Sequence, residues 1–356
     1  MDFKKIDFFS PWIVAFCIII FLAMGYIGSF NYRFEYPLNI QTISTVIFAT
    51  IIFLICSIII KSKIKIEYTY KIKDTFLSEK LLLSLTLIAI LLQCVNLILM
   101  GGIPLFDSVL KSNATTMIWR ISYLIYLPAM NILIAKNYKK RYLLLVIAGA
   151  IVYGLNGYRT SVIGVLGSAF ITLYYTKKIS RKLGIIFIAA IIVGGISIGY
   201  IASQSITNQH WMLNPIELIF YRAGFTLEVF QRILRLGGTT NGHILSMIFS
   251  SGSPRTFIGN YVLTDNVCLT STLFGPVYLD FGLIGLTIQM AFLGAFLKLI
   301  NKIAKAEKGI AIGIYSIILV HTLIWIETGP TDIMIWIFFL LGVILIALNY
   351  RNIKKV

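Results

Sequence analysis

The sequence predicts an all-α membrane protein that crosses the bilayer about ten times, and three observations carry this prediction. Of the 356 residues, 58% are hydrophobic and only 13% are charged, whereas a soluble domain carries roughly a quarter charged residues. Apolar runs of about 20 residues recur along the chain, and each can cross a hydrocarbon core of about 30 Å. The connections between these runs alternate between lysine-rich and lysine-poor.

The ten predicted spans are 11–29, 38–60, 81–100, 117–135, 142–156, 161–176, 183–203, 281–300, 309–326 and 333–349. The first is too long for the core of a signal peptide and lacks a small-x-small exit, so we expect it to be retained as a span. One long connection, 204–280, separates the seventh span from the eighth. We therefore expect three parts: spans one to seven in 1–203, a large outer loop in 204–280, and spans eight to ten in 281–356.

Five connections are rich in lysine, and they follow every second span: 61–80, 136–141, 177–182, 298–308 and 351–355. The connections between them hold few lysines and more Gly, Pro, Asn and Thr. This alternation is the positive-inside pattern of membrane proteins. It predicts that the lysine-rich side and both termini are cytoplasmic.

Residues 142–176 could instead form one helix, but its length would be roughly 52 Å. Arg159 would then lie near the middle of the bilayer, at a cost of about 2.5–3.5 kcal/mol on insertion scales. The alternation of basic connections would also fail. Two short helices that turn at 156–159 avoid all three problems. Each would be only about 23 Å long, so we expect the turn to lie below the outer surface, with Arg159 lining a depression.

Sorting the charges by predicted side separates lysine from arginine. The inner side holds 23 of the 31 basic residues and six acids, which gives +17, whereas the outer side holds eight bases and eight acids. Only Lys111 is an outer lysine, and the other outer bases are Arg33, Arg120, Arg159, Arg222, Arg232, Arg235 and Arg255. Because the excess positive charge lies on one predicted membrane face, it does not indicate that the protein binds nucleic acid. The outer arginines suit bidentate phosphate recognition, and the alternative is that they pair with the outer acids.

Within the outer loop, Asn214-Pro215 predicts a helix start and Gly237-Gly238 a helix end. Glu228 shares a helix face with Arg232 and Arg235, while Arg222 lies about 80° away from Arg232. We expect this helix to lie in or against the membrane interface. It is either an amphipathic structural helix with a salt bridge or an arginine-bearing lid over a lipid phosphate. The following stretch, 241–260, is expected to be a loop that carries His243 and Arg255.

The sequence holds no P-loop, no dinucleotide fingerprint, no H-E-x-x-H and no G-x-S-x-G. Its four cysteines have no metal-ligand spacing, so we expect neither a metal nor a cofactor. The candidate general bases are Asp280, Glu327 and His243, if burial tunes them toward the working pH. Alternatively, Asp280 caps the span that follows it, and Glu327 flanks a tight turn at 328–331.

Three short motifs resemble those of oligosaccharide repeat-unit polymerases, the O-antigen polymerase group. They are GGIPLF at 101–106, GYRT at 157–160 and DFGLIG at 280–285. The resemblance implies a GT-C-like membrane glycosyltransferase that needs no metal. Such an enzyme transfers a glycan chain from one polyprenyl pyrophosphate onto another lipid-linked repeat unit, at the outer face of the bacterial cytoplasmic membrane. Its implied partners are polyprenyl-pyrophosphate-linked oligosaccharides, the bilayer, a chain-length regulator and a flippase, and no nucleic acid.

By this resemblance Arg159 is a pyrophosphate ligand, because it lies within a matching motif. Arg222, Arg232, Arg235 and Arg255 are carried over by their location in the outer loop alone. Two alternatives stay open: a glycan ligase of similar architecture, and a flippase or transporter of lipid-linked sugars. A transporter would favour charges or broken helices in the middle of its spans, and the predicted spans here are nearly free of charge at their centres.

Overall fold

The computed structural model describes residues 7–31, 33–34, 36–66, 77–204, 213–237, 239–250, 252–263, 267–350 and 353–355. Its helices are α1 (Trp12–Gly28), α2 (Ile40–Lys63), α3 (Glu79–Leu99), α4 (Ser108–Asn113), α5 (Met117–Asn137), α6 (Tyr142–Gly154), α7 (Arg159–Tyr175), α8 (Arg181–Gln204), α9 (Pro215–Leu236), α10 (His243–Ile248), α11 (Pro254–Leu263), α12 (Gly275–Glu307), α13 (Gly309–Thr328) and α14 (Ile333–Leu348). A 3₁₀ turn, η2 (Pro104–Phe106), and two short strands, β1 (Ile64–Ile66) and β2 (Ile353–Lys355), complete the described elements.

The all-α membrane fold is confirmed, because each of the ten predicted spans contains a helix. Among the described residues, six helices are long and apolar enough to cross a membrane: α2, α3, α5, α8, α12 and α13. The shorter apolar helices are α1, α6 and α14, and α7 has 17 residues. The two short helices predicted within 142–176 are present, with the break at 155–158.

Polar side chains at the first turn explain where several spans begin. Asn39, Ser78, Thr116 and Asp332 each accept a hydrogen bond from a backbone N–H in the first turn of α2, α3, α5 and α14 respectively. Such caps satisfy N–H groups that have no partner inside the helix. An apolar run preceded by Asn, Ser, Thr or Asp is therefore enough to place these helix starts.

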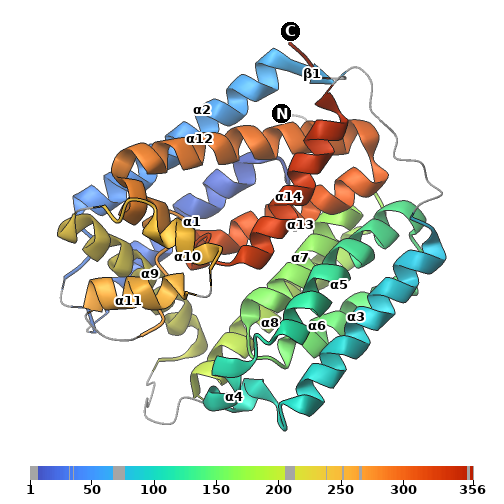
Figure 1. Ribbon diagram of the computed structural model, residues 1–356, viewed down its shortest axis with the longest axis horizontal. Helices are drawn as coiled ribbons and strands as arrows, with labels where there is room; N and C mark the ends of the chain where they lie inside the picture. Colours follow the sequence, from blue (N-terminus) through green and yellow to red (C-terminus); the bar gives the residue numbers. More distant parts are fainter. Residues whose placement is uncertain are drawn as a thin grey trace.

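Helix α13 lies at the centre of the bundle and α8 at its edge. The described side chains of α13 are buried along almost its whole length, and α13 packs against α5, α7 and α12. In contrast, α8 buries only Phe187 and Ala202. Figure 1 shows α2 running beside α12 at the top and α3 beside α5 at the right. The N-terminal helices α1 and α2 thus pack against α9 and α12, and α3 to α8 form a group beside them that contacts α13.

The lysine-rich connections gather at one end of this bundle. Strand β1, which follows α2, pairs with β2, which follows α14. Lys302 Nζ, near the end of α12, donates to the Lys61 carbonyl at 2.9 Å. Tyr175, the last residue of α7, donates its hydroxyl proton to Asp7 at 3.0 Å. The positive-inside prediction requires such a gathering, and the side of the membrane that this end faces stays a prediction.

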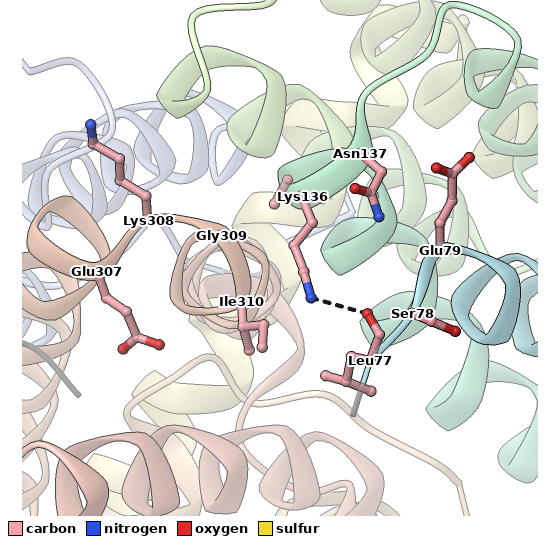
Figure 2. A pocket seen from close by; sticks show the side chains of 10 residues that line it. Leu77, Ser78, Glu79, Lys136, Asn137, Glu307, Lys308, Gly309 and Ile310 are labelled. Carbon is pink, nitrogen blue, oxygen red and sulfur yellow. Dashed lines mark hydrogen bonds between the residues drawn. The ribbon is translucent and has the colours of Figure 1, made fainter. Parts of the chain in front are cut away.

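A cavity of about 560 Å³ opens at this lysine-rich end (Figure 2). Lys136 reaches across it and donates to the Leu77 carbonyl at 3.0 Å, as the dashed line shows. Its other charged lining residues are Glu79, Glu307 and Lys308. In the part of the lining that the structure describes, two acids balance two bases, so these residues show no preference for an anion.

The large connection contains one helix that was predicted and two that were not. Asn214 and Glu217 form a capping box at the start of α9, and Gly237 ends it with φ of 61°, as predicted. The expectation of a loop over 241–260 is wrong, because α10 and α11 lie there. The two helices have only six and ten residues and lie in a stretch that is rich in Gly and Ser, so they lack the long apolar period that marks a helix in sequence.

Helix α9 packs tightly on α1 through glycine. A Cβ added at Gly28 would lie 1.9 Å from the carbonyl oxygen of Phe220, and one added at Gly224 would lie 3.0 Å from the backbone of Gly28. Small residues at such a crossing let two backbones approach closely. This contact determines which face of α9 packs on α1 and which face can contact other helices.

Candidate functional site

A second cavity, of about 540 Å³, lies at the other end of the bundle from the lysine-rich connections. Its lining comes from α4, α5, α7, α8, α9, α11, α13, α14 and the segment 268–270. The first residue of α7, Arg159, lines it, whereas the last residue of that helix contacts Asp7 at the lysine-rich end. Helix α13 runs from Gly309 at the first cavity to Thr328 at the second, so the two cavities are about one helix length apart, roughly 30 Å for 20 residues.

Two arginines that line this cavity share one carboxylate. Arg159 Nη2 donates to Glu327 Oε1, and Arg222 Nη2 lies 3.6 Å from the same oxygen. Glu327 ends the buried part of α13, and its side chain is 24% exposed. The predictions of Arg159, Arg222 and Glu327 as site residues thus fall on side chains that the structure brings together from three helices.

Two further cations line the same cavity. Arg255, at the start of α11, donates from Nε to Thr331 Oγ1 at 3.0 Å. Lys111, in α4, places its Nζ 5.9 Å from the centre of the Tyr158 ring. The Tyr158 hydroxyl donates in turn to the Lys111 carbonyl at 2.7 Å. Lys111 was noted in the sequence as the one outer lysine, but it was not predicted as a site residue.

A contact between two sequence motifs explains why Lys111 lies here. The Leu105 N–H, in GGIPLF, donates to the Leu155 carbonyl at 2.9 Å, just before GYRT. Gly157 has φ of 74°, and a Cβ there would lie 3.2 Å from the Leu105 Cα. The two motifs therefore pack against each other and carry α4, with Lys111, to the start of α7. The signal in the sequence was the proximity of Lys111 to the first motif.

The electrostatics of the cavity favour an anion. Burial lowers the pKa of Lys111, and the positive charges of Arg222 and Arg159 lower it further. Burial also lowers the pKa of Arg222, and Arg159 adds to this while Glu327 opposes it. Among the described residues, the lining holds four bases against two acids, Glu327 and Asp332. With all six ionised, the net charge is +2, and it lies in a partly enclosed space where charges are weakly screened.

The deeper part of the cavity is aromatic. The rings of Trp119 and Tyr123 stack at 5.3 Å with 9° between their planes, and both line the cavity. His321 is a buried, hydrogen-bonded side chain: it is 2% exposed and its Nε2 lies 3.2 Å from the Tyr123 hydroxyl. Its Nδ1 lies 2.8 Å from the Ile317 carbonyl. The cavity thus joins a cationic mouth to an apolar wall, which suits an amphiphilic ligand.

Asp280 and His243, the other two candidate bases, do not line this cavity. Asp280 is 2% exposed within α12, where its carboxylate accepts hydrogen bonds from the hydroxyl of Thr240 and from the Ile244 and Leu245 N–H groups. It therefore caps α10 from a neighbouring helix. It does not cap its own span, which begins earlier, at Gly275.

His243 begins α10 as an exposed residue, and its ring packs edge-on against Phe257 at 4.9 Å. The remaining predicted arginines also lie outside the cavity lining. Arg232 pairs with Glu228 at 3.1 Å, one turn away on the same helix, as predicted. Arg235 is exposed near the end of α9. Of the five predicted pyrophosphate ligands, the structure brings together Arg159, Arg222 and Arg255.

Comparison with known proteins identifies the family. Residues 7–339 match the family described as "Putative O-antigen polymerase". Two proteins of Methanocaldococcus jannaschii, both described as uncharacterised, are similar to the chain. One is 32% identical over 274 residues, which cover 73% of this chain and 74% of the relative. The other is 31% identical over 225 residues, which cover 63% of this chain and 52% of the relative. No solved structure gives a significant match. The chain therefore belongs to the O-antigen polymerase family.

Proposed function

We propose that this protein is a polysaccharide polymerase. It transfers a glycan chain from a polyprenyl pyrophosphate onto the non-reducing sugar of a second lipid-linked repeat unit. The observation that carries the proposal is the meeting of Arg159, Arg222, Arg255 and Lys111 around one cavity. A pyrophosphate that links a lipid to a sugar carries one negative charge on each phosphate, and the net charge of the lining matches it.

The chemistry needs a stabilised leaving group and an activated acceptor. The acceptor hydroxyl oxygen bonds to the anomeric carbon while the bond from that carbon to the pyrophosphate oxygen breaks, so the anomeric configuration inverts. The departing electron pair stays on the pyrophosphate, where fixed guanidinium donors stabilise the added charge without a metal. The hydroxyl proton needs a base. We propose Glu327 for this role because, of the three candidate bases, it is the one that lines the cavity.

The proposed setting is a cytoplasmic membrane in which the arginine-lined cavity faces outward and the lysine-rich end faces the cytoplasm. The similar proteins reported above are archaeal, so the bacterial membrane expected from the sequence stays a prediction. The two lipid tails would lie against the weakly buried helix α8, which borders the cavity at Gly199, Ala202 and Ser203. A chain-length regulator and a flippase stay proposed partners.

The test is a conservative change that keeps charge and removes the guanidinium fork, Arg159→Lys, in cells that lack the native gene. We expect the surface polymer to shorten or disappear, because lysine cannot bind a phosphate in the bidentate manner of arginine. Arg235→Lys is the matched control, since Arg235 is exposed and lies outside the cavity lining. Normal polymer length in the Arg159 variant would refute the assignment.

The gene deletion separates this proposal from its two alternatives. A polymerase deletion leaves single repeat units attached to the final acceptor. A ligase deletion accumulates long chains on the lipid carrier. A flippase deletion traps repeat units on the inner leaflet, which leaflet-selective labelling detects.

A further inference from the structure

Glu327 occupies the position that a phosphate oxygen would take between two guanidinium groups. Its Oε1 accepts from Arg159 Nη2 and lies 3.6 Å from Arg222 Nη2. Carboxylate and phosphate oxygens are interchangeable partners for guanidinium forks. Donors that point at Glu327 cannot at the same time point at a ligand. Arg159 and Arg222 are thus each directed through Nη2 at an anion of the protein itself.

This engagement conflicts with a simple role for Glu327 as a base. A carboxylate between two guanidinium groups is a poor proton acceptor, because its negative charge is already stabilised. It becomes a better one only when those guanidinium groups turn to another anion. Arg255 and Lys111 line the same cavity and add their charge to it, so they draw an entering anion toward Arg159 and Arg222.

We propose that Glu327 is an internal counter-anion that the donor's pyrophosphate displaces from Arg159 and Arg222, and that this displacement frees Glu327 to accept the acceptor's proton. The inference rests on the proposed function for the identity of the donor and acceptor. It orders the reaction: the pyrophosphate of the donor binds first, and only then is the base competent. After transfer, polyprenyl pyrophosphate leaves, Glu327 loses the proton to water, and its carboxylate pairs with the arginines again.

A binding measurement on the purified full-length protein tests the displacement. The probe is farnesyl pyrophosphate, a short polyprenyl pyrophosphate, titrated into protein in lipid nanodiscs. Glu327→Gln removes the competing charge and keeps the shape of the side chain. We expect it to bind the probe about tenfold more tightly, a difference of about 1.4 kcal/mol, while polymerisation in cells falls. Equal or weaker binding by this variant would overturn the proposal.

Asp332→Asn is the matched control, because it removes the same charge from the same cavity lining. Asp332 caps α14 by accepting from the Met334 N–H at 3.0 Å, and asparagine caps a helix equally well. Displacement predicts a clearly larger gain of affinity for the Glu327 variant than for the Asp332 variant. If both variants gain affinity equally, the effect is general charge removal and the proposal fails.

Glu327→Asp serves if the glutamine variant does not fold. It keeps the charge but withdraws it from the arginines by one methylene, so we expect an affinity between those of the wild type and the glutamine variant. An affinity no higher than that of the wild type would contradict displacement. The proposed function has a separate readout: if purified wild-type protein makes no polymer from lipid-linked repeat units, that function fails whether or not displacement is observed.

Discussion

Asp280 was a candidate base, but its hydrogen bonds predict a different role, as the anchor of α10. Its carboxylate accepts from the Ile244 N–H at 2.9 Å and from the Leu245 N–H at 2.8 Å, and it is 2% exposed. Asp280→Ala leaves two backbone donors without an acceptor, each worth about 1–3 kcal/mol. We expect the α10–α11 segment to lose about 2–6 kcal/mol of local stability. Arg255 at the start of α11 would then lose its fixed place at the cavity.

The assay is limited proteolysis of the purified protein, in parallel with polymer length in cells. If Asp280 is an anchor, the protease cleaves Asp280→Ala faster between α10 and α11, and this variant makes shorter polymer. Asp280→Asn keeps one acceptor oxygen, so its cleavage rate should lie between those of Asp280→Ala and the wild type. Asp107→Asn is the control, because Asp107 is an exposed cap of α4 and asparagine replaces it at little cost. A variant of Asp280 that resists protease like the wild type but makes no polymer would refute the anchor role and favour catalysis.

Three other predictions follow from the packing, the electrostatics and the proposed topology. Gly28→Ala places a Cβ 1.9 Å from the Phe220 carbonyl oxygen, so α1 and α9 must separate. The free energy of unfolding should fall by an amount typical of overpacking, about 1–3 kcal/mol, which a lower midpoint of thermal unfolding would show. Gly195→Ala, whose Cβ would make ordinary contact, should leave the midpoint unchanged. Burial and the neighbouring arginines lower the pKa of Lys111, so its ammonium loses its proton at a lower pH than an ordinary lysine. The affinity for farnesyl pyrophosphate should therefore weaken as the pH rises from neutral to alkaline. Lys111→Arg should make the affinity less dependent on pH. Cys268 is exposed and lines the cavity, so a membrane-impermeant maleimide should label it in intact cells and block polymerisation, whereas labelling only after permeabilisation would contradict the outward-facing cavity.

The spans could be predicted because length and apolarity alone identify a membrane-spanning helix in a sequence. The break before Arg159 was also predictable, since one long helix would have buried a charge. The start of α12 was not. The sequence predicted that this span starts at 281, but the helix begins at Gly275, and Gly282 interrupts it with φ of 61°. Such a kink depends on what packs beside it, here α10, and no local pattern encodes that neighbour.

The kind of site could be predicted from the sequence, but which residues line it could not. The preference for arginine over lysine on the predicted outer side of the membrane indicated a phosphate ligand. The helical period predicted that Arg222 and Arg232 lie on different faces of α9. Which of these two faces the cavity depends on where α9 rests on α1, through Gly28 and Gly224. That contact joins segments nearly 200 residues apart, so the order of residues along the chain could not decide it.

The two ends of the molecule use their cations in different ways, and this difference argues for the role given to arginine. At the lysine-rich end, Lys136 and Lys302 donate to backbone carbonyls, which ties connections together. At the other end, Arg255 donates from Nε to Thr331, and its Nη groups are further donors on the same planar fork. A guanidinium can therefore be held in place by the protein and still offer N–H groups to a ligand. A lysine ammonium is a single point charge at that position, so the preference for arginine at the cavity follows from the need to fix a cation and bind a phosphate with the same side chain.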